Sequence, residues 1–272
     1  MKNKWNARLG AAVLIACCVA TAFVAPAFAA DKADKKEVVK QARQSYYSLR
    51  GQGLSQFQCS AEPDWAMLLA EQQKTDPASF ERAVKKLKEI HFVVALRPDG
   101  SVNVTHNDVT GDNDEMKKGL AQIYSGMEQM VSGFFATWSP FMLTNPFPEV
   151  ESDYQLEDQG AQYRLAYKDG TADVVTTMGK DFNISEVNVV TKEFKSRMQP
   201  QFSKSSAGFL LSGYQAEYTG SQPGDATQLQ VRVEYQSVNG LQLPQKLNLA
   251  GSYGGSPFQI EVAFTGCQAD RK

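Results

Sequence analysis

The chain has 272 residues, and its 28 basic and 30 acidic side chains give a net charge of -2 at neutral pH. This near balance, without a basic run interleaved with aromatic residues, argues against nucleic acid as a partner. The length fits one large β-rich domain as well as two small ones, and no linker-like segment divides it.

The N-terminus has the pattern of a secretory signal peptide. "MKNKWNARLGAAVLIACCVATAFVAPAFAA" has a basic head, an apolar stretch and small residues before a polar segment, which predicts cleavage after Ala29. The alternative is a lipid tether, because "LIAC" resembles a lipobox ending at Cys17. We favour simple cleavage, since apolar rather than polar sequence follows Cys17. Residues 1–29 are then the signal peptide, and residues 30–272 form one periplasmic or secreted domain.

Two further features of residues 30–272 concern the membrane and the redox state of the compartment. They contain no apolar stretch of about 18 residues, so no membrane span is expected. They retain Cys59 and Cys267 of the four cysteines. An oxidising compartment favours a disulfide between these two, and the alternative is a pair of unpaired buried thiols.

The first half of the exported chain has mainly helical patterns. Apolar positions recur every three or four residues over 34–49, which predicts an amphipathic helix before a strand at 54–60. Residues 62–90 form a helical insertion of two helices, with Asp64 able to cap the first and Asp76, followed by proline, able to start the second. Residues 92–104 then alternate around a "PDG" turn, which predicts a β-hairpin.

A second helical insertion, about 113–139, has a continuous apolar stripe. We expect Asp112 or Asp114 to cap this helix and Pro140 to end it. The stripe has spacings of three and four residues and consists of Met116, Leu120, Ile123, Met127, Met130, Phe134 and Trp138. Packing in a core is the first explanation of such a stripe.

The chain after Glu151 alternates apolar and polar residues with a period of two, which predicts antiparallel strands with one apolar and one polar face. The apolar face requires a cover, and the helices provide the matching apolar surface. If the sheet is strongly curved, an apolar cavity remains beneath them. The alternation therefore predicts one antiparallel sheet whose apolar face is covered by helices.

Residues suited to catalysis are sparse. His91 and His106 do not have metal-site spacing, and structural roles explain both. No G-x-S-x-G elbow, phosphate loop or dinucleotide fingerprint occurs. Helix capping explains the acidic residues of 108–115 better than Ca²⁺ binding does. We therefore predict no catalytic residue, no metal and no cofactor, and an enzyme is the least favoured class.

The end of the second helical insertion is the best candidate for a ligand site. Flexible thioethers beside aromatic rings suit an adaptable apolar pocket. The predicted ligand-binding residues are Met127, Met130, Phe134, Phe135, Trp138, Phe141 and Met142.

Two phrases and the order of elements resemble the LolA-like group of periplasmic lipoprotein carriers. The phrases are "SYYSLRGQGLSQFQC" and "VEYQSVNGLQLPQKLNL". The resemblance implies an α+β fold with a single strongly curved antiparallel sheet, an unclosed barrel, whose concave apolar face is covered by helices and binds acyl chains. This chain departs from the group in its larger helical insert and in having no alignable gating residue. We expect a monomeric, non-catalytic binding protein for a lipid or acylated protein. The alternative is an envelope protein-interaction or signalling module on the same fold, without a ligand cavity.

Overall fold

The structure of the chain is a computed structural model that describes residues 30–111, 113–220, 226–253 and 256–272. The predicted signal peptide, including Cys17, lies outside the described residues, as does Asp112.

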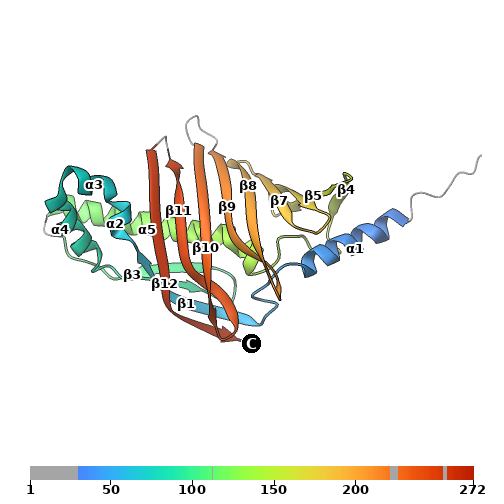
Figure 1. Cartoon of the computed structure of the whole chain (residues 1–272), viewed down its shortest axis with the longest axis horizontal. Helices are drawn as coiled ribbons and strands as arrows, with labels where there is room; N and C mark the ends of the chain where they lie inside the picture. The colour runs from blue at the N-terminus through green and yellow to red at the C-terminus, as the bar shows by residue number, and fades with distance from the viewer. Residues whose placement is uncertain (1–29, 112, 221–225, 254–255) are drawn as a thin grey trace, which may run out of the picture.

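Twelve strands form one antiparallel, unclosed sheet in the order β3-β2-β1-β12-β11-β10-β9-β8-β7-β6-β5-β4 (Figure 1). The strands are β1 Leu54–Pro63, β2 Phe92–Leu96, β3 Val102–His106, β4 Tyr154–Asp158, β5 Gln162–Asp169, β6 Ala172–Gly179, β7 Ile184–Val190, β8 Phe194–Ser205, β9 Gly208–Gly220, β10 Ala226–Val238, β11 Leu241–Tyr253 and β12 Ser256–Arg271. From β4 to β12, neighbours in sequence are neighbours in the sheet. The predicted single unclosed antiparallel sheet is confirmed.

Alternation along each strand divides the sheet into a buried and an exposed face. On β10, Val231 and Val233 are buried while Gln230 and Arg232 are exposed. The turn into β11 fixes this register, because Asn239 and the following glycine both adopt positive φ angles, of 51° and 78°, as a tight hairpin turn requires.

Five helices are present in the described residues: α1 Ala30–Gln44, α2 Trp65–Leu68, α3 Ala70–Thr75, α4 Pro77–Leu87 and α5 Asp114–Met142. The insertion at 62–90 therefore contains three helices rather than two. Both predicted caps are confirmed: the Asp64 carboxylate accepts from the N–H groups of Ala66 and Met67, and that of Asp76 accepts from the Ser79 N–H.

The first helix ends earlier than the sequence predicts. It stops at Gln44 instead of continuing to residue 49, because the backbone of the next residues pairs with β9. The Phe209 N–H donates to Ser45 O, and the Tyr47 N–H donates to Phe209 O, at 2.8 and 3.0 Å.

The two predicted ends of the long helix α5 were also wrong. Asn113 is its N-cap and accepts from the Met116 N–H, in place of Asp112 or Asp114. The helix continues through Pro140 to Met142, because a proline so close to the end removes a single helical N–H, and the Leu143 N–H still donates to Ser139 O at 2.8 Å.

Helix α5 connects the two edges of the sheet, since it lies between β3 and β4 in the chain. In Figure 1 it runs across the sheet behind β12, β11, β10 and β9, while α2, α3 and α4 gather near its start. Its inward side is buried against the apolar face of the sheet, where the main core lies.

Cys59 of β1 and Cys267 of β12 form the predicted disulfide. The two strands are paired, and the register shifts between Gln58 and Ser60 of β1, where Cys59 lies. The bond therefore crosses the pair formed by the first and last strands of the chain.

Candidate functional site between helix α5 and the sheet

The seven residues predicted to bind a ligand all lie on α5, and the structure buries six of them. Met127, Phe134, Phe135, Trp138, Phe141 and Met142 are at most 4% exposed, and Met130 is half-buried. They belong to the same core as the apolar face of the sheet. The structure thus brings the predicted residues together at the boundary between helix and sheet.

Aromatic rings join α5 to the first and last strands. The Phe135 ring centroid lies 5.8 Å from that of Phe57 on β1 and 5.8 Å from that of Phe264 on β12. The Phe134 ring is stacked with the same Phe264 ring, and their centroids are 6.4 Å apart. Each such ring pair stabilises the fold by about 0.5–1.5 kcal/mol in addition to the free energy gained by burying its apolar area.

Trp138 is held by a short chain of hydrogen bonds. Its Nε1–H donates to the Tyr235 hydroxyl at 3.0 Å, and that hydroxyl donates to Leu211 O at 2.6 Å. Burial raises the pKa of the Tyr235 hydroxyl, so it remains a proton donor at neutral pH. This pair could not be predicted from the sequence, because Trp138 and Tyr235 belong to distant segments.

The C-terminal end of α5 is fixed by the backbone on two sides. The Leu49 N–H donates to Met142 O at 2.8 Å, and the Leu211 N–H lies 3.3 Å from the Met142 sulfur. The segment after the helix is held to α1, where the Arg43 guanidinium donates to the carbonyls of Phe147 and Pro148 at 2.7 and 2.8 Å. A groove of about 650 Å³ lies at this junction.

Part of the apolar face beside α5 is accessible. We define the apolar rim as Phe194, Tyr218, Leu229 and Phe258, which are partly exposed; Phe194 is 39% exposed. The Tyr218 hydroxyl lies 3.5 Å from Thr137 Oγ1 of α5. A Cβ on Gly251 would lie within 3.2 Å of both the Leu229 and Phe258 side chains. The rim therefore lies on strands that the helix-based prediction missed, and it reaches α5 through Tyr218.

Three glycines at seven-residue intervals occur on the outer part of α5. A Cβ on Gly119, Gly126 or Gly133 would meet nothing within 4 Å. Packing therefore does not require glycine at these positions. Each costs a helix about 1 kcal/mol relative to alanine, so α5 is intrinsically weaker than its length suggests.

The described residues offer little for metal binding or for crossing a membrane. They contain no group of three or more His, Cys, Asp and Glu side chains placed to hold a metal ion. His106 instead stacks on Tyr124 of α5, with ring centroids 3.9 Å apart. Within these same residues, each helix is too short or too polar to cross a bilayer.

Searches with the sequence and the structure found no matching family model, no matching curated protein and no matching solved structure.

Proposed function

We propose that the protein binds an acyl chain or a similar elongated apolar ligand between α5 and the sheet, without chemical change to the ligand. The observation that carries this proposal is the contact of one helix with the apolar face of a one-layer sheet. A single helix joining the two sheet edges presents methionine and aromatic side chains to that face. Thioethers and flat rings rearrange around ligands of different shape more readily than β-branched side chains do.

In this proposal the side chains between α5 and the sheet occupy the ligand's place when no ligand is bound. Binding then moves α5 outward from a concave apolar face, and the chain enters over the apolar rim. Two features support this movement: the three outward glycines weaken the helix, and the rim already exposes apolar surface beside it. The C-terminal end of α5, which the N–H groups of Leu49 and Leu211 hold at Met142, acts as the hinge.

The resemblance to LolA-like carriers adds the class of ligand. It favours a lipid or the acyl chains of a lipoprotein as cargo, and a periplasmic site of action. The proposed cargo would replace contacts within the apolar core by contacts with its own methylene groups, each worth about 0.8 kcal/mol on burial.

A second candidate is a protein-interaction module in which α5 never moves. The observation that favours it is the hydrogen-bonded chain from Trp138 through Tyr235 to Leu211, because a buried tryptophan N–H with a partner is typical of a permanent core. In that case the ligand space does not exist, and the outer surfaces carry the function.

The fluorescence of Trp138 distinguishes the two candidates. The other tryptophan in residues 30–272 is Trp65, which is also buried, so Trp65→Phe leaves Trp138 as the reporter. Delipidated Trp65→Phe protein is titrated with palmitate and, separately, with dodecyl maltoside below its critical micelle concentration. A carrier shows a saturable shift in emission, whereas a permanent core shows none.

A stability measurement on Phe134→Ala provides the second readout. In a permanent core this truncation lowers the free energy of unfolding by roughly 3–5 kcal/mol, with or without ligand. In a carrier the ligand-free variant loses less, and palmitate stabilises it less than it stabilises the unmutated protein. Leu54→Ala, on the buried face of β1 rather than on α5, is the control for an ordinary core position. A full core-type loss without any fluorescence response would end the carrier proposal.

A further inference from the structure

The face of the sheet opposite α5 has a row of glutamines in register across five strands. Gln199 of β8 pairs with Gln215 of β9, which pairs with Gln230 of β10. The row continues through Ala250 of β11 to Gln259 of β12. The four glutamines are exposed and alternate with buried residues of the α5 side, so their side chains point away from the helix.

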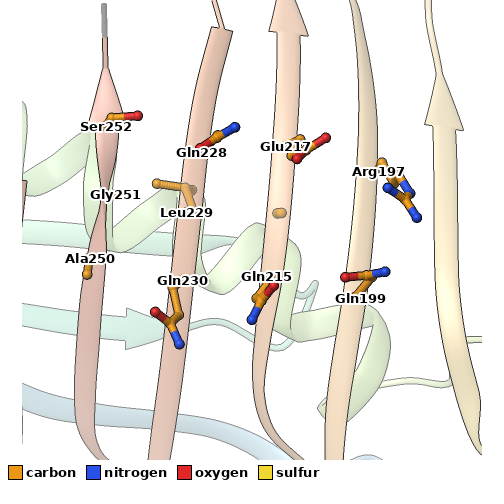
Figure 2. A pocket seen from close by; sticks show the side chains of 11 residues that line it. Arg197, Gln199, Gln215, Glu217, Gln228, Leu229, Gln230, Ala250, Gly251 and Ser252 are labelled. Carbon is orange, nitrogen blue, oxygen red and sulfur yellow. The ribbon is translucent and has the colours of Figure 1, made fainter. Parts of the chain in front are cut away.

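This row lies along a hollow in the sheet surface, which we call the glutamine trough. Two grooves of about 450 and 500 Å³ share Gln230 and Ala250 and so adjoin one another. Ala250 leaves the middle of the row without a long side chain. Figure 2 shows the first groove, with side chains of β8, β9, β10 and β11 around it. The trough therefore has a low centre bordered by amide groups.

Small residues also shape the sheet around the trough. A Cβ on Gly213 would lie 2.4 Å from Val231 O, and one on Gly251 would lie 2.2 Å from Gln228 O. Both glycines allow neighbouring backbones to approach more closely than any other residue would permit. These two glycines thus bring the backbones of β9, β10 and β11 close together beside the trough.

The amides of the row are available for a ligand. Within the described part of the chain, the side chains of Gln199, Gln215, Gln230 and Gln259 make no hydrogen bond. Each carboxamide offers two donor hydrogens and two acceptor lone pairs. Cross-strand neighbours stand about 5 Å apart, so the amides repeat at this interval from β8 to β10, and Gln259 follows one strand beyond the gap at Ala250.

The charges around the trough balance. Its two grooves are lined by Arg197 and Arg232 and by Glu217 and Glu234. Arg197 is further neutralised by Glu186, with an N–O distance of 2.7 Å. A balanced surface lacks the excess of cations that nucleic acids and other polyanions require. Its lining also lacks the aromatic anchors that concentrate binding energy at protein interfaces.

From these observations we propose that the glutamine trough binds a neutral oligosaccharide. A sugar hydroxyl is both donor and acceptor, and so is a carboxamide, so a row of amides complements the hydroxyls along a glycan chain. Balanced charge and the regular repeat fit an uncharged polymer better than they fit a protein surface. This site lies on the opposite face of the sheet from α5, and Leu229 of the apolar rim is the one rim residue that also borders it.

Calorimetric titration of the protein with uncharged tetrasaccharides tests the proposal. Chitotetraose represents N-acetylated wall glycans, and cellotetraose and maltotetraose represent plain glucans, so the three separate the two sources of such a chain. We expect saturable binding of at least one of them. Gln215→Ala combined with Gln230→Ala should weaken it about tenfold, since two hydrogen-bonding groups are lost.

Two further variants sharpen the test. Ala250→Tyr fills the centre of the trough while retaining all four glutamines, and should weaken binding at least as much. Gln155→Ala with Gln268→Ala removes two exposed glutamines of β4 and β12 that do not line the trough, and should leave affinity unchanged. Binding of no tetrasaccharide, equal weakening in this control, or binding of only charged glycans would overturn the proposal. The fluorescence response to palmitate should be unaffected in all three variants.

Discussion

At the residue scale, the buried hydroxyl of Tyr235 is the most informative single group. It accepts from Trp138 and donates to Leu211 O, so Tyr235→Phe leaves one buried donor and one buried acceptor without this partner. We expect a loss of about 1–3 kcal/mol in the free energy of unfolding, measured by urea denaturation.

Tyr218→Phe is the matched control for that variant. The Tyr218 side chain is partly exposed and its hydroxyl lies 3.5 Å from Thr137 Oγ1, so we expect water to replace the contact. Its removal should change stability by less than about 0.5 kcal/mol, as at other surface positions. Equal losses of stability in the two variants would show that the hydrogen bonds of the Tyr235 hydroxyl stabilise the protein no more than the contact of the Tyr218 hydroxyl does.

Residue roles were predictable from the sequence where they are local. Asp64 and Asp76 cap helices that begin within three residues of them, and both assignments are confirmed. The choice of Asp112 or Asp114 over Asn113 failed, because all three side chains can cap and their order along the chain does not decide among them. The Trp138–Tyr235 contact was beyond prediction, because it depends on how β10 faces α5.

At the scale of elements, we predict that alanine in place of an outward glycine of α5 stabilises the helix. Gly126→Ala and Gly133→Ala add a methyl group that meets nothing within 4 Å, so no clash opposes the gain. Each should stabilise the protein by about 0.5–1 kcal/mol in thermal or urea unfolding. If α5 moves to admit a ligand, the double variant should also exchange palmitate more slowly in stopped-flow fluorescence.

Gly213→Ala is the contrasting variant for this prediction. Its Cβ would lie 2.4 Å from Val231 O, so the same chemical change should destabilise the protein there. A loss of stability in Gly126→Ala would mean that the outer side of α5 is occupied in the folded protein. If the double variant is more stable but exchanges palmitate at an unchanged rate, the stability of α5 does not control ligand entry.

Element types followed from hydrophobic period, whereas element ends depended on tertiary contacts. The stripe from Met116 to Trp138 and the alternation of β10 predicted a helix and a strand correctly. The predicted end of α1 was wrong because Phe209 of β9 donates a hydrogen bond to Ser45 O and accepts one from the Tyr47 N–H. The glutamine row was visible as a set of polar positions, but its register across β8, β9 and β10 was not.

At the scale of the molecule, the fold places the first and last strands of the described chain side by side. Strand β1 pairs with β12, so a short early segment completes a sheet whose other strands follow one another. The sequence predicted an antiparallel sheet but not this order, since pairing between distant segments leaves no periodic signal. The cysteines were the exception, because an exported pair is expected to be joined.

The disulfide therefore tests the architecture of the whole molecule. Cys59 and Cys267 are separated by 208 positions, and joining them restricts the unfolded chain more than any local contact does. The loop-entropy relation gives a stabilisation on the order of 5 kcal/mol, and measured values for native disulfides are about 2–5 kcal/mol. Cys59→Ser should lower the melting temperature of residues 30–272 under oxidising conditions.

A comparison with and without reductant separates the bond from the side-chain change. Dithiothreitol should lower the stability of the unmutated protein nearly to that of Cys59→Ser, and should leave the variant itself unaffected. A thiol reagent added after unfolding should find no free thiol in the unreduced protein and one, at Cys267, in the variant. Because β1 pairs with β12 through many backbone hydrogen bonds and Phe57 also contacts α5, we expect the reduced protein to retain its fold with a lower unfolding midpoint. Two reactive thiols in the unreduced protein would show that the first and last strands are held together by pairing and packing alone.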